Sequence, residues 1–142
     1  LLKNKMDLEH HEHEHMQRTA FTYTVLSPSG DHCLGCVYIT PLGARIAADH
    51  IPEKYFPDPN SFSADVCFWL RPSLQKLGHD LKLLRALQKW FQEEWRFDHI
   101  FFHTSKATEH QQQSFEQGGL IEIARFEADD PHSGKWVLYK IP

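Results

Sequence analysis

The sequence predicts a mixed α/β fold in which two parallel strands lie at the centre of one sheet and antiparallel strands flank them. Three observations support this prediction. Two apolar runs of strand length are separated by a long amphipathic segment, which is typical of a strand-helix-strand unit with a right-handed crossover. A hairpin pattern precedes this unit, and a second pair of strand-like runs follows it. The hairpins place antiparallel strands at the edges.

Composition and charge indicate one domain over residues 1–142 and exclude several classes of protein. With 41% hydrophobic and 24% charged residues, a chain of 142 residues can form a core without disulfides. The formal net charge of −4 gives no basic excess for nucleic acid, and no apolar run approaches the roughly 18 residues of a membrane span. Three cysteines are too few for a disulfide framework, and no signal peptide is evident. We expect a cytoplasmic protein.

The first third of the chain predicts a helix and a hairpin. Residues 1–18 lack Gly and Pro and carry a thin apolar stripe, which favours a helix. Because the chain begins without Met, we expect this helix to be the remainder of a longer N-terminal region, followed by a core over residues 21–142. The β-branched and aromatic runs Phe21–Leu26 and Cys33–Ile39 predict two strands around a Ser-Pro-Ser-Gly-Asp turn.

The middle of the chain predicts the central unit. Four prolines make residues 40–63 irregular. The run Ala64–Leu70 is largely apolar, as expected for a strand covered on both faces, and Phe97–His103 is a second buried strand. Between them, apolar residues recur at three- and four-residue spacing and predict an amphipathic helix of about five turns. These residues are Leu77, Leu81, Leu84, Leu87, Phe91 and Trp95.

The last third predicts a helix and a second hairpin. Ala107–Gln117 reads as a polar helix, and the Gly118-Gly119 pair that follows it is a typical helix C-terminus. Leu120–Phe126 and Trp136–Ile141 are the two final strands.

The turn between the first central strand and the long helix is the most informative stretch. It reads Leu-Arg-Pro-Ser-Leu-Gln-Lys-Leu-Gly-His-Asp-Leu over residues 70–81. A turn into a helix N-terminus gathers free backbone N–H groups, and together with the helix dipole these form a site suited to phosphate. A glycine there, Gly78, lets a ligand approach the backbone closely.

This turn resembles the acyl-CoA pyrophosphate loop of the GCN5-related N-acetyltransferase superfamily, whose pattern is Arg/Gln-x-x-Gly-x-Gly/Ala. Gln75 supplies the first position and Gly78 the second, whereas Asp80 stands where the family has Gly or Ala. The Gly119-Leu120 pair is similar to the family's Gly-Phe ending of a short helix. The order of predicted elements also matches that of the family from the first hairpin to the C-terminus.

The resemblance implies an acyl-CoA N-acyltransferase-like fold in which the two central parallel strands splay apart and hold acetyl-CoA as co-substrate. Backbone groups of the first strand would pair with the pantetheine arm, and N–H groups of the loop would hold the pyrophosphate. The cofactor-binding residues implied in this way are Phe68, Trp69, Leu70, Gln75, Lys76, Leu77, Gly78, His79, Asp80, Thr108 and Phe115.

Three of these residues depart from the family pattern. Phe115 takes the usual Tyr position but cannot protonate a departing thiolate, and its alternative role is that of a core aromatic. The Asp80 carboxylate would repel a pyrophosphate unless it points away, and an acidic residue in a first helical turn is common in any protein. Thr108 stands where the family often has Asn, and it either donates to the cofactor or caps its helix.

Acyl transfer to an amine needs a base and a proton donor for the leaving thiolate. Asp65 opens the first central strand, where the resemblance implies an acidic residue, and His103 ends the neighbouring strand. Both are candidate catalytic residues, although a solvated carboxylate at a strand end is the simpler interpretation of Asp65. Glu53, in the loop that would line an acceptor site, is a lesser candidate.

These observations predict an acyl-CoA-dependent N-acyltransferase, without a metal, whose acceptor is an amine of a small molecule or peptide. The edge strands favour a homodimer. The departures at Asp80 and Phe115 motivate an alternative, which is a non-catalytic domain of the same fold that binds CoA weakly or serves as a protein-interaction module.

Two further motifs invite a metal hypothesis. Cys33 and Cys36 lie three residues apart, so in a regular strand their thiols diverge unless a bulge intervenes, and we expect them to be small buried residues. His11 and His15 share one face of the predicted N-terminal helix, where two imidazoles can chelate a divalent ion. A solvated polar face is the simpler interpretation.

Overall fold

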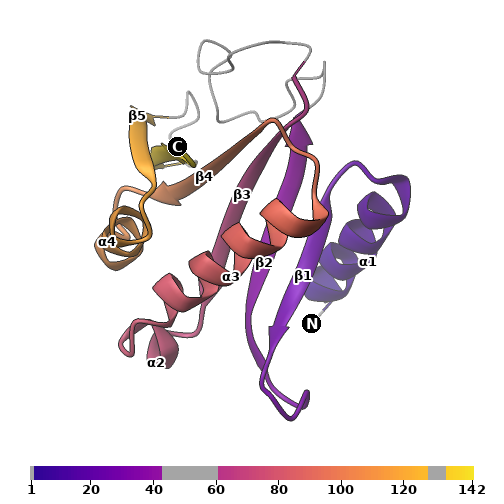
Figure 1. Ribbon diagram of the computed structural model, residues 1–142. Coiled ribbons are helices and arrows are strands. Elements are labelled where there is room, and N and C mark those ends of the chain that lie inside the picture. The colour runs from indigo at the N-terminus through magenta and orange to yellow at the C-terminus, as the bar shows by residue number, and fades with distance from the viewer. Residues whose placement is uncertain (1, 43–60, 128–133) are drawn as a thin grey trace.

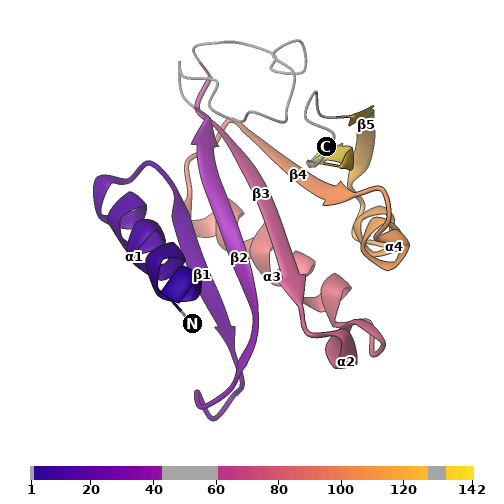
Figure 2. The same cartoon turned by 180° about the vertical axis from the view of Figure 1, so that it is seen from behind.

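The computed structural model describes residues 2–42, 61–127 and 134–142, and it contains one mixed sheet with helices on both faces (Figures 1 and 2). The sheet has six strands in the order β1-β2-β3-β4-β6-β5. Their bounds are β1 Phe21–Leu26, β2 Cys33–Leu42, β3 Ser63–Leu70, β4 His99–Ser105, β5 Ile121–Glu127 and β6 Lys135–Lys140.

The strand directions confirm the predicted mixed sheet. The central pair β3 and β4 runs parallel, and every other neighbouring pair in the sheet is antiparallel. A parallel pair needs a crossover connection. Here α2 (Pro72–Gln75) and α3 (His79–Glu94) provide it.

The helices cover the two faces of the sheet differently. α3 and α4 (Glu109–Gln117) lie on one face, and α1 (Leu2–Gln17) lies on the other, against β1 (Figures 1 and 2). The main apolar core lies under α3 and α4 and includes Leu84, Phe91, Phe102 and Phe115. Within the described ranges, no helix is long and apolar enough to cross a membrane.

Strand β3 is buried on both faces only in its first half. Val66 and Phe68 point into the core and are 0% and 5% exposed. The alternate residues face the other side, where Asp65 is 4% exposed but Trp69 is 43% exposed. Cys67, between these two on that face, is half-buried. The prediction of a strand covered on both faces is therefore wrong for its second half.

The connection after β3 also differs from the prediction. The turn contains a short helix, α2, that begins at Pro72, because proline is well suited to the first position of a helix. Gly78 then adopts a left-handed conformation (φ 72°) and separates α2 from α3. As a result α3 begins at His79, and Leu77, which we expected within the long helix, is 73% exposed.

The helix α1 is confirmed, but its predicted apolar stripe does not face the protein. Met6, Leu8 and Met16 are 60%, 63% and 77% exposed. Histidines pack on the sheet instead, with the His11 ring centroid 5.7 Å from that of Tyr38 and the His15 centroid 5.0 Å from that of Phe21. Aromatic rings of β1 and β2 therefore contact these imidazoles. The described residues contain no group of three or more His, Cys, Asp or Glu side chains that could hold a metal ion.

Gly35 in β2 allows the close approach of β2 to β3. A Cβ atom at this position would lie 2.1 Å from the Trp69 carbonyl oxygen and 3.0 Å from the Leu70 Cα. We expect Gly35→Ala to lower the free energy of unfolding by about 1–3 kcal/mol in a urea titration, because backbone atoms must move.

Gly30→Ala is the matched control for this prediction. Gly30 has φ 78° but open space around it, so alanine there meets only backbone strain, worth about 1 kcal/mol. A loss in Gly35→Ala no greater than that in Gly30→Ala would contradict the argument from close approach.

Candidate active site at the diverging strands

The two parallel strands separate part-way along their length. Their register runs from Ser63 opposite His99 to Val66 opposite Phe102, and beyond this point β3 and β4 no longer pair. Figure 2 shows β4 turning away from β3 toward α4. The sequence analysis expected this splay from the family resemblance.

Beyond the divergence, the edge of β3 that no longer pairs with β4 is occupied by two glutamine side chains. The Phe68 carbonyl accepts a hydrogen bond from Gln111 Nε2 (2.9 Å), and the Leu70 carbonyl accepts one from Gln75 Nε2 (2.7 Å). Because residues two apart present their backbone groups to the same edge, both carbonyls face the gap. Trp69 lies between them, and its indole donates to the Tyr38 hydroxyl (3.3 Å) on the opposite face of the sheet.

Gln111 bridges the gap between the strands. Its Oε1 accepts a hydrogen bond from Thr104 Oγ1 on β4 (2.5 Å), while its Nε2 donates to β3. Gln111 and Thr104 are 5% and 3% exposed, so this bridge is buried. A ligand that paired with the Phe68 carbonyl would have to displace the Gln111 amide.

A carboxylate and an imidazole form a buried pair where the strands begin to separate. Asp65 Oδ1 lies 2.7 Å from His103 Nδ1, and the two residues are 4% and 6% exposed. Both belong to the face opposite α3, since Asp65 alternates with the core residue Val66. The Trp136 ring packs edge-on against the imidazole, with centroids 5.1 Å apart.

The electrostatics of this pair favour the imidazolium form. Burial by itself lowers the pKa of His103, but the charge of Asp65 and its hydrogen bond outweigh burial. Smaller contributions from Cys67 act in the same direction, and the pKa of His103 rises to about 10. At neutral pH the site therefore holds a proton on His103 that can be transferred.

Fewer backbone N–H groups are available for the predicted anion site than its sequence suggests, and those that remain lie in the first turn of α3. The N–H groups of Lys76, Leu77 and Gly78 are already used within the α2 turn, donating over 3.2, 3.1 and 3.0 Å. The next three N–H groups, from His79 to Leu81, open α3 and have no carbonyl one turn earlier within the helix.

Asp80 lies inside the protein rather than on the outer surface of this loop. It is 1% exposed, and its Oδ2 lies 3.3 Å from His110 Nε2 on α4. This is ion-pair distance without hydrogen-bond alignment, and neither Asp80 oxygen has a hydrogen-bond partner among the described residues. Burial raises the pKa of Asp80, while the charge of His110 and the amide of Gln111 act in the opposite direction.

Thr108 and Phe115 lie on α4. Thr108 occupies the N-cap position, but its side chain makes no capping hydrogen bond. Phe115 is 0% exposed and packs against the rings of Phe68, Phe102 and Tyr139. Phe115 thus takes its alternative role as a core aromatic.

The remaining candidates are placed as follows. Glu53 lies outside the described residues. The exception for a bulge applies to Cys33 and Cys36, because a register shift where Leu26 pairs with Cys33 marks a bulge or irregularity, and both residues are half-buried rather than buried. Burial raises the pKa of the Cys36 thiol, and Cys33 adds to that rise.

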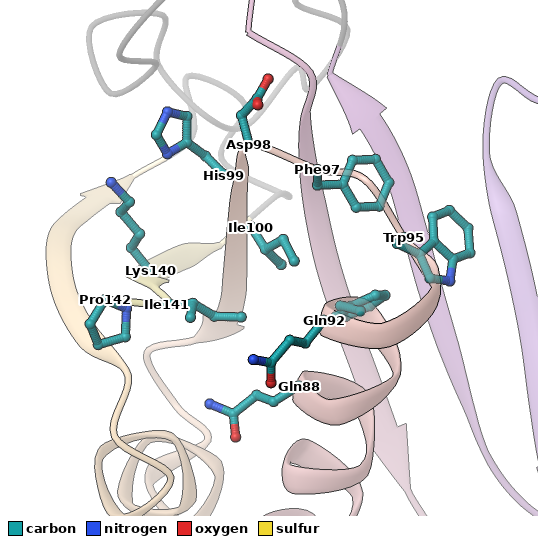
Figure 3. A pocket seen from close by; sticks show the side chains of 11 residues that line it. Gln88, Gln92, Trp95, Phe97, Asp98, His99, Ile100, Lys140, Ile141 and Pro142 are labelled. Carbon is teal, nitrogen blue, oxygen red and sulfur yellow. The ribbon is translucent and has the colours of Figure 1, made fainter.

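A cavity of about 680 Å³ opens elsewhere, between the second half of α3, the start of β4 and the C-terminal residues (Figure 3). Trp95, Phe97 and Ile100 form apolar parts of its wall, and Gln92 and Lys140 provide polar ones. None of the residues that we expected to bind acyl-CoA lines it, so this cavity is separate from the candidate active site.

Sequence analysis did not identify Gln111 or Cys67 as parts of the site. Gln111 lies in a run of three glutamines on a polar helix, a pattern typical of a solvated surface. Cys67 lies two residues after Asp65 and faces the same side of β3. This spacing is the signal from which its place beside His103 could have been predicted.

Comparison with solved structures identifies the architecture. No protein-family model matches the sequence, and no curated protein matches it. Spermidine N-acetyltransferase SpeG of Vibrio cholerae superposes with a TM-score of 0.68 over 94% of this chain and 71% of its own, at 12% identity. The chain has the GCN5-related N-acetyltransferase fold.

Two further acetyltransferases of this fold are similar. The ribosomal-protein-S5-alanine acetyltransferase of Vibrio fischeri has a TM-score of 0.68 at 14% identity, covering 96% of this chain and 69% of that one. The aminoglycoside acetyltransferase AAC(6')-Ib, solved with coenzyme A and kanamycin, has a TM-score of 0.66 at 18% identity, covering 89% and 68%. At these identities the similarity establishes the fold alone.

Proposed function

We propose that this protein is an acyl-CoA-dependent N-acyltransferase that transfers an acyl group, with acetyl as the simplest case, to a primary amine of a small molecule or peptide. The observation that carries this proposal is the buried Asp65–His103 pair at the point where β3 and β4 of a GCN5-related N-acetyltransferase fold separate. The solved relatives named above are acetyltransferases, and one of them was solved with coenzyme A.

The proposed chemistry assigns one role to each member of the pair. When the amine nitrogen bonds to the thioester carbonyl carbon and the carbon–sulfur bond breaks, His103 donates its proton to the leaving sulfur. The neutral imidazole then accepts the proton that the new amide must lose, so protons balance over the cycle. Asp65 holds the ring in place through Nδ1 and stabilises its positive charge.

The test of this function is isothermal titration with acetyl-CoA, followed by an amine screen that measures release of free CoA. We expect saturable binding with a Kd in the micromolar range. Gly78→Glu should weaken it at least 30-fold, because a carboxylate would crowd and repel a pyrophosphate at the first turn of α3.

Gly30→Glu is the control, since Gly30 shares a positive φ but lies in the β1–β2 turn, outside the connection between α2 and α3. We expect its acetyl-CoA affinity to match that of the parent. Binding that is unaffected by Gly78→Glu would place the phosphates elsewhere, and no binding at millimolar acetyl-CoA would refute the proposed function.

The second candidate function is a non-catalytic domain of the same fold, and a specific observation favours it. Gln111 and Gln75 already occupy the β3 carbonyls that pantetheine would use, and the Asp80 carboxylate is buried beside the first turn of α3. In such a domain these polar side chains would fill the gap in place of a cofactor.

Asp80→Ala separates the two candidates. In an enzyme we expect acetyl-CoA to bind about tenfold more tightly to this variant, because one buried negative charge near the phosphates is removed. Titration calorimetry of the parent and the variant measures this ratio. A non-catalytic domain should bind acetyl-CoA weakly or not at all, and neither the parent nor Asp80→Ala should release CoA in the amine screen.

A further inference from the structure

The residue at the divergence that the proposed chemistry leaves unused is Cys67. It is the first residue of β3 beyond the last strand pair, Val66 with Phe102, and His103 is the first such residue of β4. Cys67 and Asp65 lie two residues apart on one strand and therefore face the same side of the sheet. The Cys67 thiol and the Asp65–His103 pair therefore lie on the same face of the sheet, where the two strands separate.

The Cys67 thiol influences the protonation of the His103 imidazole. Both its charge and its hydrogen-bonding contribution act to raise the pKa of His103, alongside those of Asp65. His103 Nδ1 is bonded to Asp65 Oδ1 at 2.7 Å, so the ring can exchange a proton with the thiol only through Nε2. This order of groups, thiol then imidazole then carboxylate, is the arrangement that activates a cysteine nucleophile.

Accessibility distinguishes the three groups. Asp65 and His103 are 4% and 6% exposed, whereas Cys67 is only half-buried. Of the three groups, the thiol is therefore the most open to a reactant that enters between the strands. On the β2 side of Cys67, Tyr38 lies directly opposite it in the β2–β3 register.

We propose that Cys67 accepts the acyl group before the amine does, so that the reaction passes through an acyl-cysteine. This proposal rests on the proposed function. In the first step Cys67 Sγ bonds to the thioester carbonyl carbon, the bond from that carbon to the CoA sulfur breaks, and the thiol proton passes through His103 to the CoA sulfur. No oxidant or reductant takes part.

The second step regenerates the thiol. The amine nitrogen bonds to the carbonyl carbon of acyl-Cys67, the carbon–sulfur bond breaks, and a proton from the amine passes through His103 to Cys67 Sγ. The sum of the two steps is acyl transfer from CoA to the amine. Free CoA is released before the amine binds.

The experiment omits the amine. The full chain is mixed with acetyl-CoA, quenched in acid after seconds to minutes, and its intact mass and peptide map are measured together with the free CoA released. We expect one acetyl group per chain, on Cys67, and one equivalent of CoA. Cys67→Ala should carry no acetyl group, bind acetyl-CoA within twofold of the parent, and lose at least 100-fold in turnover of any accepted amine.

Cys36→Ser is the matched control, because Cys36 is a half-buried thiol on the neighbouring strand β2. We expect it to be acetylated on Cys67 like the parent. The same protein unfolded in urea should not be labelled within the same time, which excludes simple thiol reactivity.

The outcomes separate the two proposals. Parent protein that binds acetyl-CoA but gains no acetyl group on Cys67, or Cys67→Ala that keeps turnover within threefold, overturns the acyl-cysteine and leaves the proposed function intact. Parent protein that does not bind acetyl-CoA refutes both. Acetylation on Cys33, Cys36 or a lysine in place of Cys67 also overturns the inference.

Discussion

Asp65→Ala is expected to lower the free energy of unfolding by about 3–5 kcal/mol at neutral pH, because it leaves the buried His103 imidazolium without its partner. A urea titration of the parent and the variant at pH 7 measures this loss.

The stability that Asp65 contributes should depend on pH through the protonation of His103. The pKa of His103 is raised in the folded protein to about 10, from a usual value of about 6.5. The stabilisation is therefore complete below about pH 6.5 and is lost as the pH rises toward 10. We expect the stability difference between the parent and Asp65→Ala to shrink over this range.

Asp31→Ala is the matched control for this prediction. Asp31 and His32 form the same kind of pair, with 2.6 Å between Oδ1 and Nδ1, but both side chains are exposed. Solvent screens such a pair, so its removal should change stability little. If Asp65→Ala were as mild as Asp31→Ala, the buried pair would not stabilise the fold.

Phe115→Ala is expected to cost about 3–5 kcal/mol in the same titration, because it leaves a cavity in the core. The Phe115 ring is 0% exposed, and its centroid lies 5.8 Å from that of Phe68, 5.7 Å from that of Phe102 and 5.2 Å from that of Tyr139.

Phe62→Ala provides the comparison, since Phe62 is 47% exposed and, among the described residues, stacks on Phe97. We expect it to lose less than half as much stability. Phe115→Leu, which keeps most of the side-chain volume, should bind acetyl-CoA like the parent. A stable Phe115→Ala variant with impaired acetyl-CoA binding would return Phe115 to the binding site.

The elements were predictable wherever local pattern determines them. The β-branched and aromatic runs identified the strands, and the apolar spacing that includes Leu84 and Phe91 identified α3. Asp65 and His103 were both candidates from their strands. Only the parallel register could show that their side chains meet.

What escaped prediction depends on contacts between distant segments. The bulge between β1 and β2 is a property of pairing, and no single strand reveals it. The thin apolar stripe of α1, which includes Met6 and Met16, is exposed, and His15 packs against the Phe21 ring of β1 instead. Gln111 reads as a surface residue until the carbonyl of Phe68, 43 positions earlier, is placed beside it.

The bridge through Gln111 has a consequence for how any ligand enters between β3 and β4. A ligand amide that takes the place of the Gln111 amide on the Phe68 carbonyl leaves the number of hydrogen bonds to that carbonyl unchanged. This contact then adds little net affinity, which must arise from other parts of the ligand. Association also waits for the glutamine to swing aside, so we expect the rate of complex formation to reach a plateau as ligand concentration rises.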